Sequence, residues 1–302
     1  MGEPGLQGPG SSTIMGHPRK ASEQPARRLL IISSSAGAMT PAIEAKLRSL
    51  FADHRIVPFD PKTDFEKLVT PRARVVIAGG DGSVEFVIRN LADSKHPVGI
   101  LSLGTFNNFA LALGLPPGLD EQIKVIKTGR ARAITLGRVN GNVFLEACAI
   151  GLFGQTIALG EAAKDGVYGS FVTALREVLS AKRFRYVLQG DIAGDGSAMS
   201  LVFTNISSIG ARLPVSDAKP TGTYLEFSVH AGRTKTDIAV RALASALLMK
   251  HREEGAGQVF RFRQLSVTTL PRVRVYADNM FVGRTPATVT AEPSALKVIL
   301  PG

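Results

Sequence analysis

The chain has 302 residues, of which 44% are hydrophobic and 20% charged, a balance that excludes a mainly disordered protein and suits two domains of ordinary size. A net charge of +11 would attract anionic partners such as nucleotides, nucleic acid or acidic lipid headgroups without choosing among them. One cysteine, Cys148, excludes a disulfide framework and a cysteine-based zinc site, and its apolar neighbours predict a core thiol.

The first residues of the chain have the composition of an unstructured segment. Residues 1–26 are rich in Gly, Pro and Ser and hold no continuous apolar stretch, so we predict a disordered tail rather than a signal peptide or anchor. The sequence contains no uninterrupted run of about 18 apolar residues, so we predict no membrane-spanning helix. We therefore expect a cytoplasmic protein whose contact with lipid is peripheral, at the inner membrane surface.

Strand and helix alternate through residues 27–132, which predicts a Rossmann-like parallel α/β domain. The predicted strands are Leu29–Ile32, His54–Pro58, Arg74–Ala78 and Val98–Leu103. The predicted helices are Pro41–Phe51, Asp64–Val69, Ser83–Leu91 and Asn107–Leu113.

Residues 133–302 predict a second, β-rich and sandwich-like domain. It opens with a hairpin of Ala133–Val139 and Asn142–Ile150 across an Asn-Gly turn, a strong short-range hairpin pattern. The other predicted strands are Tyr186–Gln189, Ser200–Asn205, Tyr224–His230, Gln264–Thr269, Val273–Tyr276 and Leu296–Leu300. Helices are predicted near Glu161–Ala181 and Asp237–Lys250.

The most informative segment is residues 75–83, an apolar strand that runs into Gly-Gly-Asp-Gly-Ser before a helix. Glycines let main-chain amides approach an anion, and the start of the following helix adds N–H groups and positive dipole. This pattern is typical of a phosphate-binding loop. It is equally compatible with a tight turn in which Asp81 or Ser83 caps the helix.

A second loop follows 24 residues after Gly80, where Leu-Gly-Thr-Phe-Asn-Asn-Phe-Ala again joins a strand end to a helix start. Ligands of open α/β sheets bind at the carboxyl ends of the strands, so Thr105 and Asn107 could reach a ligand held by the first loop. The alternative is helix capping by Thr105 or Asn107 alone.

These two segments resemble signatures of one family. Residues 79–83 are similar to the Gly-Gly-Asp-Gly-Thr loop of diacylglycerol, sphingosine and NAD kinases. Residues 103–110 resemble the Leu-Gly-Thr-x-Asn-Asp-Phe-Ala signature of the lipid kinase branch, which NAD kinases do not share. The resemblance to the diacylglycerol kinase and sphingosine kinase family implies ATP, with Mg²⁺ on its phosphates, in a cleft between the two domains.

By this resemblance the second domain provides the lipid side of the cleft. The nucleotide-binding residues it implies are Gly79, Gly80, Asp81, Gly82, Ser83, Val84, Glu85, Gly104, Thr105 and Asn107.

Several positions depart from the family pattern. Asn108 and Leu111 stand where the family has Asp and Arg, and residues 33–37 keep only small residues and the final glycine of Asn-Pro-x-Ser-Gly. Lys-Pro-Thr-Gly-Thr at residues 219–223 replaces an Asp-Asp-Gly stretch that helps to hold a structural magnesium, so we assign no metal ligand.

The segment Val-Tyr-Ala-Asp-Asn-Met at residues 275–280 resembles the family's Val-x-x-Asp-Gly-Glu, whose acidic pair is implicated in deprotonating the lipid hydroxyl. The resemblance thus implies Asp278 as catalytic base, while Met280 cannot accept a proton. Alternatively, Asp278 belongs to a hairpin turn whose geometry Asn279 supplies.

The sequence therefore predicts an ATP-dependent lipid kinase of phospholipid metabolism that acts on a diacylglycerol- or sphingoid-like hydroxyl. The alternative is a catalytically degenerate relative that binds nucleotide or acidic lipid without phosphoryl transfer. We expect no nucleic-acid partner, because no base-stacking aromatic motif accompanies the positive charge.

Overall fold

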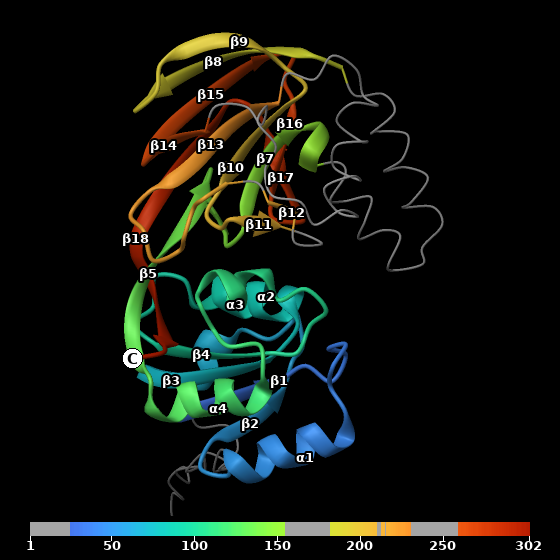
Figure 1. The fold of residues 1–302 in the computed structure, drawn as a ribbon, viewed down its shortest axis with the longest axis vertical. Helices are drawn as coiled ribbons and strands as arrows, with labels where there is room; N and C mark the ends of the chain where they lie inside the picture. Colours follow the sequence, from blue (N-terminus) through green and yellow to red (C-terminus); the bar gives the residue numbers. More distant parts are fainter. Residues whose placement is uncertain (1–24, 155–181, 210–212, 215, 231–258) are drawn as a thin grey trace, which may run out of the picture.

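The computed structural model describes residues 25–154, 182–209, 213–214, 216–230 and 259–302 (Figure 1). The predicted tail lies outside these ranges except for its last two residues, and so do the predicted helices Glu161–Ala181 and Asp237–Lys250.

One lobe is a parallel sheet with helices on both faces, in the lower half of Figure 1. Its strands pair in the order β2-β1-β3-β4, all parallel. The strands are β1 (Ala26–Ile32), β2 (Arg55–Pro58), β3 (Val69–Gly79) and β4 (Pro97–Ser102). The helices are α1 (Pro41–Leu50), the 3₁₀ helix η2 (Phe65–Leu68), α2 (Asp81–Leu91), α3 (Asn108–Ala112) and α4 (Leu119–Thr128).

Strand β1 illustrates why the sheet needs a continuous apolar run. Leu29 and Ile31 pack into the core under α2 and α3, whereas Leu30 and Ile32 pack into a separate core with α1 and α4. Each of these side chains is at most 1% exposed. A strand covered on both faces must be apolar at every position, as in doubly wound sheets.

The other lobe is β-rich. Its six-stranded sheet has the order β14-β13-β10-β7-β16-β17. Those strands are β7 (Ala147–Gly151), β10 (Ser200–Thr204), β13 (Leu225–His230), β14 (Val259–Phe262), β16 (Arg274–Ala277) and β17 (Met280–Arg284). The strands opposite are β5 (Arg130–Val139), β6 (Asn142–Phe144), β8 (Phe184–Gly190), β9 (Gly194–Ala198), β15 (Gln264–Leu270) and β18 (Ala287–Leu300). A small pair is formed by β11 (Ser208–Ile209) and β12 (Leu213–Pro214).

Side chains from both sheets of this lobe form one core. Phe203 stacks on Phe227 with ring centroids 4.9 Å apart, and Cys148 lies fully buried in the same cluster. Burial raises the pKa of the Cys148 thiol, so the predicted core thiol is confirmed. The predicted fold class, a parallel α/β region followed by a β-rich sandwich-like region, is confirmed as well.

Strand β18 joins the lobes. Its first half pairs antiparallel with β15, and Lys297 and Val298 pair in parallel with Pro97 and Val98 of β4. Strand β5 runs antiparallel beside β18 through both parts. The sheet therefore continues without a break past the predicted domain boundary between residues 132 and 133. That boundary stays a prediction.

The predicted hairpin at Asn140 and Gly141 is confirmed, with φ of 47° and 85° and Val139 paired with Asn142. Its second strand, however, is not continuous to Ile150 as predicted. The strand breaks at Leu145 and Glu146, and β6 and β7 enter different sheets. No helix among the described residues is long and apolar enough to cross a membrane.

Candidate functional site

A cleft of about 580 Å³ lies between the two lobes. The parallel lobe lines it with the loops that follow β1, β3 and β4. The β-rich lobe lines it with the break between β6 and β7 and with the turn between β16 and β17. The cleft thus lies outside the carboxyl ends of parallel strands, where open α/β sheets bind ligands.

The two glycine loops touch each other in this cleft. A Cβ atom added to Gly104 would lie 2.8 Å from the Cα of Gly80 and 3.2 Å from the main-chain nitrogen of Asp81. Contacts that short force the backbone to move, so only glycine fits at this crossing. The sequence prediction that the two loops face one crevice is therefore confirmed.

Hydrogen bonds hold the second loop against the first. The carboxylate of Asp81 accepts the main-chain N–H of Asn107 at 2.9 Å. The Asn107 side chain accepts the N–H of Gly104 at 2.8 Å and donates to the Gly104 carbonyl at 2.9 Å. Asn107 itself has a left-handed backbone, with φ of 53°. Asp81 and Asn107 therefore fix the shape of both loops.

Neither helix start is closed by a side-chain cap. Gly80 is the N-cap of α2 and Asn107 that of α3, and neither makes a side-chain capping bond. The Ser83 hydroxyl donates to the Gly80 carbonyl at 3.2 Å. The alternative interpretation, in which side chains of these loops cap the helices, is therefore not supported. The positive end of the α2 dipole faces the cleft.

The structure brings most of the sequence-predicted residues to the cleft wall. Those lining it are Gly80, Asp81, Gly82, Ser83, Glu85, Gly104, Thr105 and Asp278. Three others lie behind it: Gly79 ends β3, Val84 is 4% exposed in the core, and Asn107 braces Gly104.

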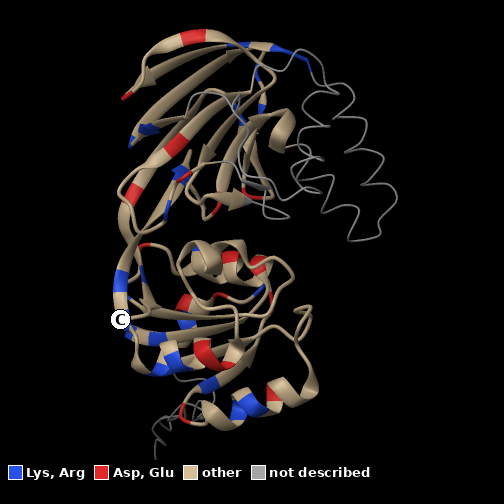
Figure 2. Cartoon of the chain, viewed as in Figure 1, with Lys and Arg blue, Asp and Glu red and all other residues tan. Residues whose placement is uncertain are grey.

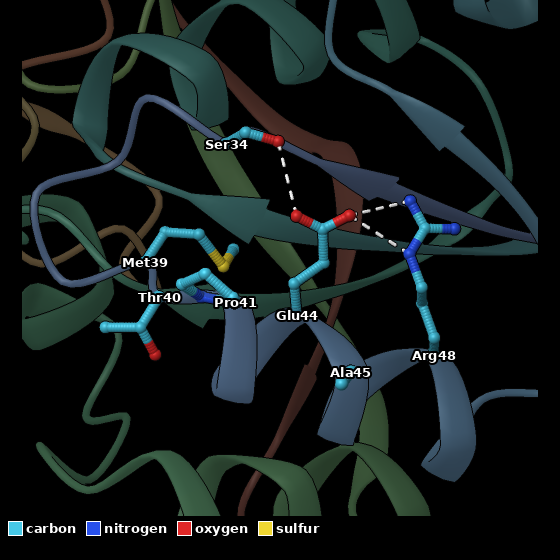
Figure 3. A pocket seen from close by; sticks show the side chains of 7 residues that line it. All are labelled: Ser34, Met39, Thr40, Pro41, Glu44, Ala45 and Arg48. Atoms are coloured by element: carbon cyan, nitrogen blue, oxygen red, sulfur yellow. Dashed lines mark hydrogen bonds and ion pairs between the residues drawn. The ribbon is translucent and has the colours of Figure 1, made fainter.

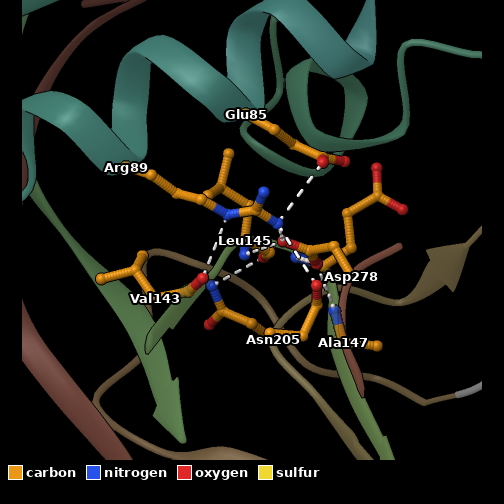
Figure 4. Close-up of polar contacts among 9 residues, drawn as sticks. Glu85, Arg89, Val143, Leu145, Ala147, Asn205 and Asp278 are labelled. Atoms are coloured by element: carbon orange, nitrogen blue, oxygen red, sulfur yellow. Dashed lines mark hydrogen bonds and ion pairs between the residues drawn. The ribbon is translucent and has the colours of Figure 1, made fainter. Parts of the chain in front are cut away.

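The carboxylate of Asp278 accepts hydrogen bonds from groups of both lobes (Figure 4). One oxygen accepts the main-chain N–H groups of Glu146 and Ala147 at 2.8 and 3.0 Å. The other accepts the N–H of Leu145 at 3.0 Å and the guanidinium of Arg89 at 2.7 Å. These four donors match the acceptor capacity of an ionised carboxylate.

The same residue forms the turn between β16 and β17, because Ala277 pairs with Met280 across Asp278 and Asn279. The left-handed conformation belongs to Asp278, with φ of 50°, rather than to Asn279, to which the sequence analysis assigned the turn geometry. Asp278 thus combines a turn position with a place in the cleft wall, and its N–H donates to the Ala147 carbonyl at 2.7 Å.

Arg89 ties α2 to the β-rich lobe. Besides Asp278, its guanidinium donates to the Val143 carbonyl at 3.1 Å and lies 3.5 Å from Glu85 (Figure 4). Arg89 is not among the residues predicted from sequence, because one arginine on a helix carries no local signal for a partner 189 residues away.

Glu146 is a second residue that sequence analysis missed. It lines the cleft and is 9% exposed. Burial and the nearby carboxylates of Glu85, Asp278 and Asp81 raise its pKa well above the usual value of 4.5, against an opposing hydrogen bond with Asn108. A glutamate inside the apolar run before Cys148 was the available signal.

Four carboxyl side chains line the cleft, from Asp81, Glu85, Glu146 and Asp278, and within the described residues no Lys or Arg lines it. A polyphosphate would be repelled by this wall unless divalent cations accompanied it. The geometry fits a metal–nucleotide complex, with α2 and the loop amides at its phosphates. No trio of metal-ligand side chains in the described ranges is grouped to hold a cation by itself.

A smaller hollow of about 360 Å³ lies beside α1 (Figure 3). Its Glu44 accepts hydrogen bonds from Ser34 at 3.5 Å and from Arg48 at 2.7 Å. The polar groups therefore satisfy one another, and we assign no ligand there.

Comparison with known proteins agrees with the two loop signatures. Residues 29–139 match the family model described as the diacylglycerol kinase catalytic domain. A Staphylococcus haemolyticus protein provisionally named a lipid kinase is 25% identical over 74% of this chain and 75% of its own length. A Yersinia pestis protein named "Probable lipid kinase YegS-like" is 38% identical over 32% of this chain and 35% of its own length.

The fold is shared with a solved structure. The crystal structure of a diacylglycerol kinase from Bacillus anthracis superposes with a TM-score of 0.69 at 20% identity. The match covers 91% of this chain and 97% of that one. The predicted resemblance to the diacylglycerol kinase family is confirmed.

Proposed function

We propose, from the diacylglycerol kinase catalytic domain of residues 29–139, that the protein transfers the γ-phosphate of ATP to the hydroxyl of a diacylglycerol- or sphingoid-like lipid. The observation that carries the proposal is the contact of the loops at Gly80 and Gly104, which directs the start of α2 and Thr105 into one cleft.

In this proposal the main-chain N–H groups at the start of α2 bind the ATP phosphates. The Thr105 hydroxyl, which lines the same cleft, binds the nucleotide beside them. Magnesium bound to the phosphates would neutralise charge during transfer. The acidic wall supports this role for magnesium, because it provides no lysine or arginine among its described residues.

The lipid would approach along the turn between β16 and β17. Asn279 of this turn lines the cleft, and the next two residues, Met280 and Phe281, are 39% and 51% exposed. The Arg274 guanidinium lies 5.4 Å from the centre of the Phe281 ring, and Arg284 pairs with Arg274 across the hairpin. Exposed apolar side chains flanked by arginines suit the surface of an anionic membrane.

A second candidate is a protein that binds nucleotide without transferring phosphate. Two observations favour it. The carboxylate of Asp278 already accepts four hydrogen bonds, and Met280 stands where the family signature has Glu. A base in that position would need a free lone pair.

The decisive experiment uses the purified full chain with γ-labelled ATP, magnesium and vesicles containing diacylglycerol, ceramide or a sphingoid base. We expect label in one lipid product, and a reduction of both label transfer and ATP affinity in Gly104→Ala. ATP binding by calorimetry without transfer to any of these lipids would establish the second candidate. Absence of ATP and ADP binding would overturn both.

A further inference from the structure

The proposed transfer needs a group that takes the proton of the lipid hydroxyl, and Asp278 is poorly placed for that task. Three main-chain N–H groups and Arg89 bind its two oxygens. A proton arriving at either oxygen would have to displace one of these hydrogen bonds, because the four donors fill the acceptor positions of the carboxylate. Asp278 acts here as the anchor that joins the turn, the strand break and α2.

Glu146 occupies the strand break that Asp278 organises. Its main-chain N–H donates to Asp278 at 2.8 Å, and its carbonyl accepts the N–H of Asn205 at 2.9 Å. The backbone is therefore fixed on both sides of the residue. The side chain lines the same cleft as the two glycine loops and hydrogen-bonds with Asn108 at the start of α3.

The environment of Glu146 favours the proton-accepting role. Desolvation and three neighbouring carboxylates hold its pKa well above the usual value. A carboxylate with a raised pKa is a stronger base than an ordinary one, and such groups are concentrated at functional sites. A purely structural residue would gain from being glutamine, which would keep an amide partner for Asn108 without a buried ionisable group.

The other two carboxylates of the wall have positioning contacts. Asp81 accepts the N–H of Asn107 and so holds the loops together. Glu85 lies 3.5 Å from Arg89, one turn further along α2. Glu146 stands on the opposite wall of the cleft, and within the described residues the structure gives it neither an ion pair nor a loop-bracing contact of this kind.

We propose that Glu146 is the proton acceptor for the lipid hydroxyl, a role that rests on the kinase activity proposed above. The hydroxyl oxygen forms a bond to the γ-phosphorus while the bond from that phosphorus to the β,γ-bridging oxygen breaks. ADP leaves with the electron pair of the broken bond. The hydroxyl proton passes to the Glu146 carboxylate, which releases it to solvent after the phospholipid product departs.

The test is the pH profile of lipid phosphorylation by the full chain and by Glu146→Gln. We expect the wild-type rate to rise with pH along an acid limb, and Glu146→Gln to lose that limb together with about 10²- to 10⁴-fold in kcat. ATP affinity measured by calorimetry should change less than kcat. Glu226→Gln is the control, because Glu226 is also a buried glutamate of the β-rich lobe, 3% exposed and bound to Arg261, and it does not line the cleft.

Chemical rescue separates a base from a structural group. In Glu146→Ala, added formate should restore part of the rate, because a small carboxylate can occupy the vacated space. Melting temperatures of each variant identify a folding defect. Unchanged kcat and an unchanged acid limb in a folded Glu146→Gln would overturn the inference alone. Absence of lipid phosphorylation by the wild type would overturn the proposed kinase activity as well.

Discussion

Gly80 and Gly104 meet at the floor of the cleft, where the space between their backbones has no room for a Cβ atom. Each belongs to a loop that leaves the carboxyl end of a parallel strand, and β3 and β4 are neighbours in the sheet. The contact explains why two separated segments of sequence behave as one binding surface.

Gly104→Ala should therefore separate the loops. The added Cβ would meet the backbone of Gly80 and Asp81, and overpacking of this kind costs about 1–3 kcal/mol. We expect ATP affinity measured by calorimetry to fall at least about tenfold. Gly194→Ala is the control, since a Cβ at Gly194 meets nothing within 4 Å. Equal ATP affinity in both variants would contradict the proposal that the contact between Gly80 and Gly104 shapes the nucleotide site.

Asp278→Asn should destabilise the whole chain, because an amide cannot accept from three main-chain donors and an arginine at once. Removing one partner of a buried ion pair costs about 3–5 kcal/mol, which we expect as the loss of unfolding free energy in urea. Asp191→Asn provides the comparison: Asp191 accepts two main-chain N–H groups at an exposed position, so its loss should be much smaller. A stable Asp278→Asn variant would show that the anchor is not needed.

The parts of the site that sequence could predict are local. Residues 79–83 and 103–110 each show a strand end, glycine and helix start within a few positions, and parallel strand ends must meet at one edge. The helix α4, which is not among the predicted helices, could also have been predicted from sequence. Pro-Pro-Gly precedes it, and Asp120 and Glu121 occupy its first turn.

The break before Glu146 could not be predicted in the same way. Phe-Leu-Glu-Ala-Cys-Ala-Ile looks like one buried strand, and what interrupts it is the carboxylate of Asp278, more than 130 residues later, which takes three consecutive N–H groups. Local strand or helix propensity carries no information about a hydrogen-bond partner that is more than 130 residues away in sequence. The hydrogen bonds to Asp278 therefore interrupt a segment whose local pattern favours a continuous strand. The glutamate within the apolar run was the sequence signal for this break.

The stability of the chain should depend on pH through Glu146. Because its folded-state pKa is raised, the folded chain keeps a proton that the unfolded chain has released at pH above about 4.5. The folded state then binds more protons, so unfolding free energy falls as pH rises from that value through the folded-state pKa. Glu146→Gln lacks this loss and should gain stability relative to the wild type from acidic to neutral pH.

Urea unfolding of both proteins across this range measures the difference, in which all other groups cancel. Asp191→Asn should show the opposite slope. Hydrogen bonds from the N–H groups of Arg263 and Gln264 lower the pKa of Asp191, so its contribution is present at neutral pH and lost as pH falls through the lowered value. If the difference in unfolding free energy between the wild type and Glu146→Gln did not change with pH, this result would contradict a raised pKa of Glu146.

Phe281→Ser should weaken binding to anionic vesicles in a sedimentation assay. Phe281 is half exposed beside the cleft, and moving such a ring into lipid contributes about 1.5–3 kcal/mol, so we expect about a tenfold loss. Leu50→Ser is the matched control, because Leu50 is 38% exposed on α1, in the other lobe. Added salt should weaken wild-type binding further, since the arginines around the ring act through the surface potential. An equal loss in Phe281→Ser and Leu50→Ser would show that lipid does not approach along the β16–β17 turn, and the acceptor hydroxyl would have to reach Glu146 from another side.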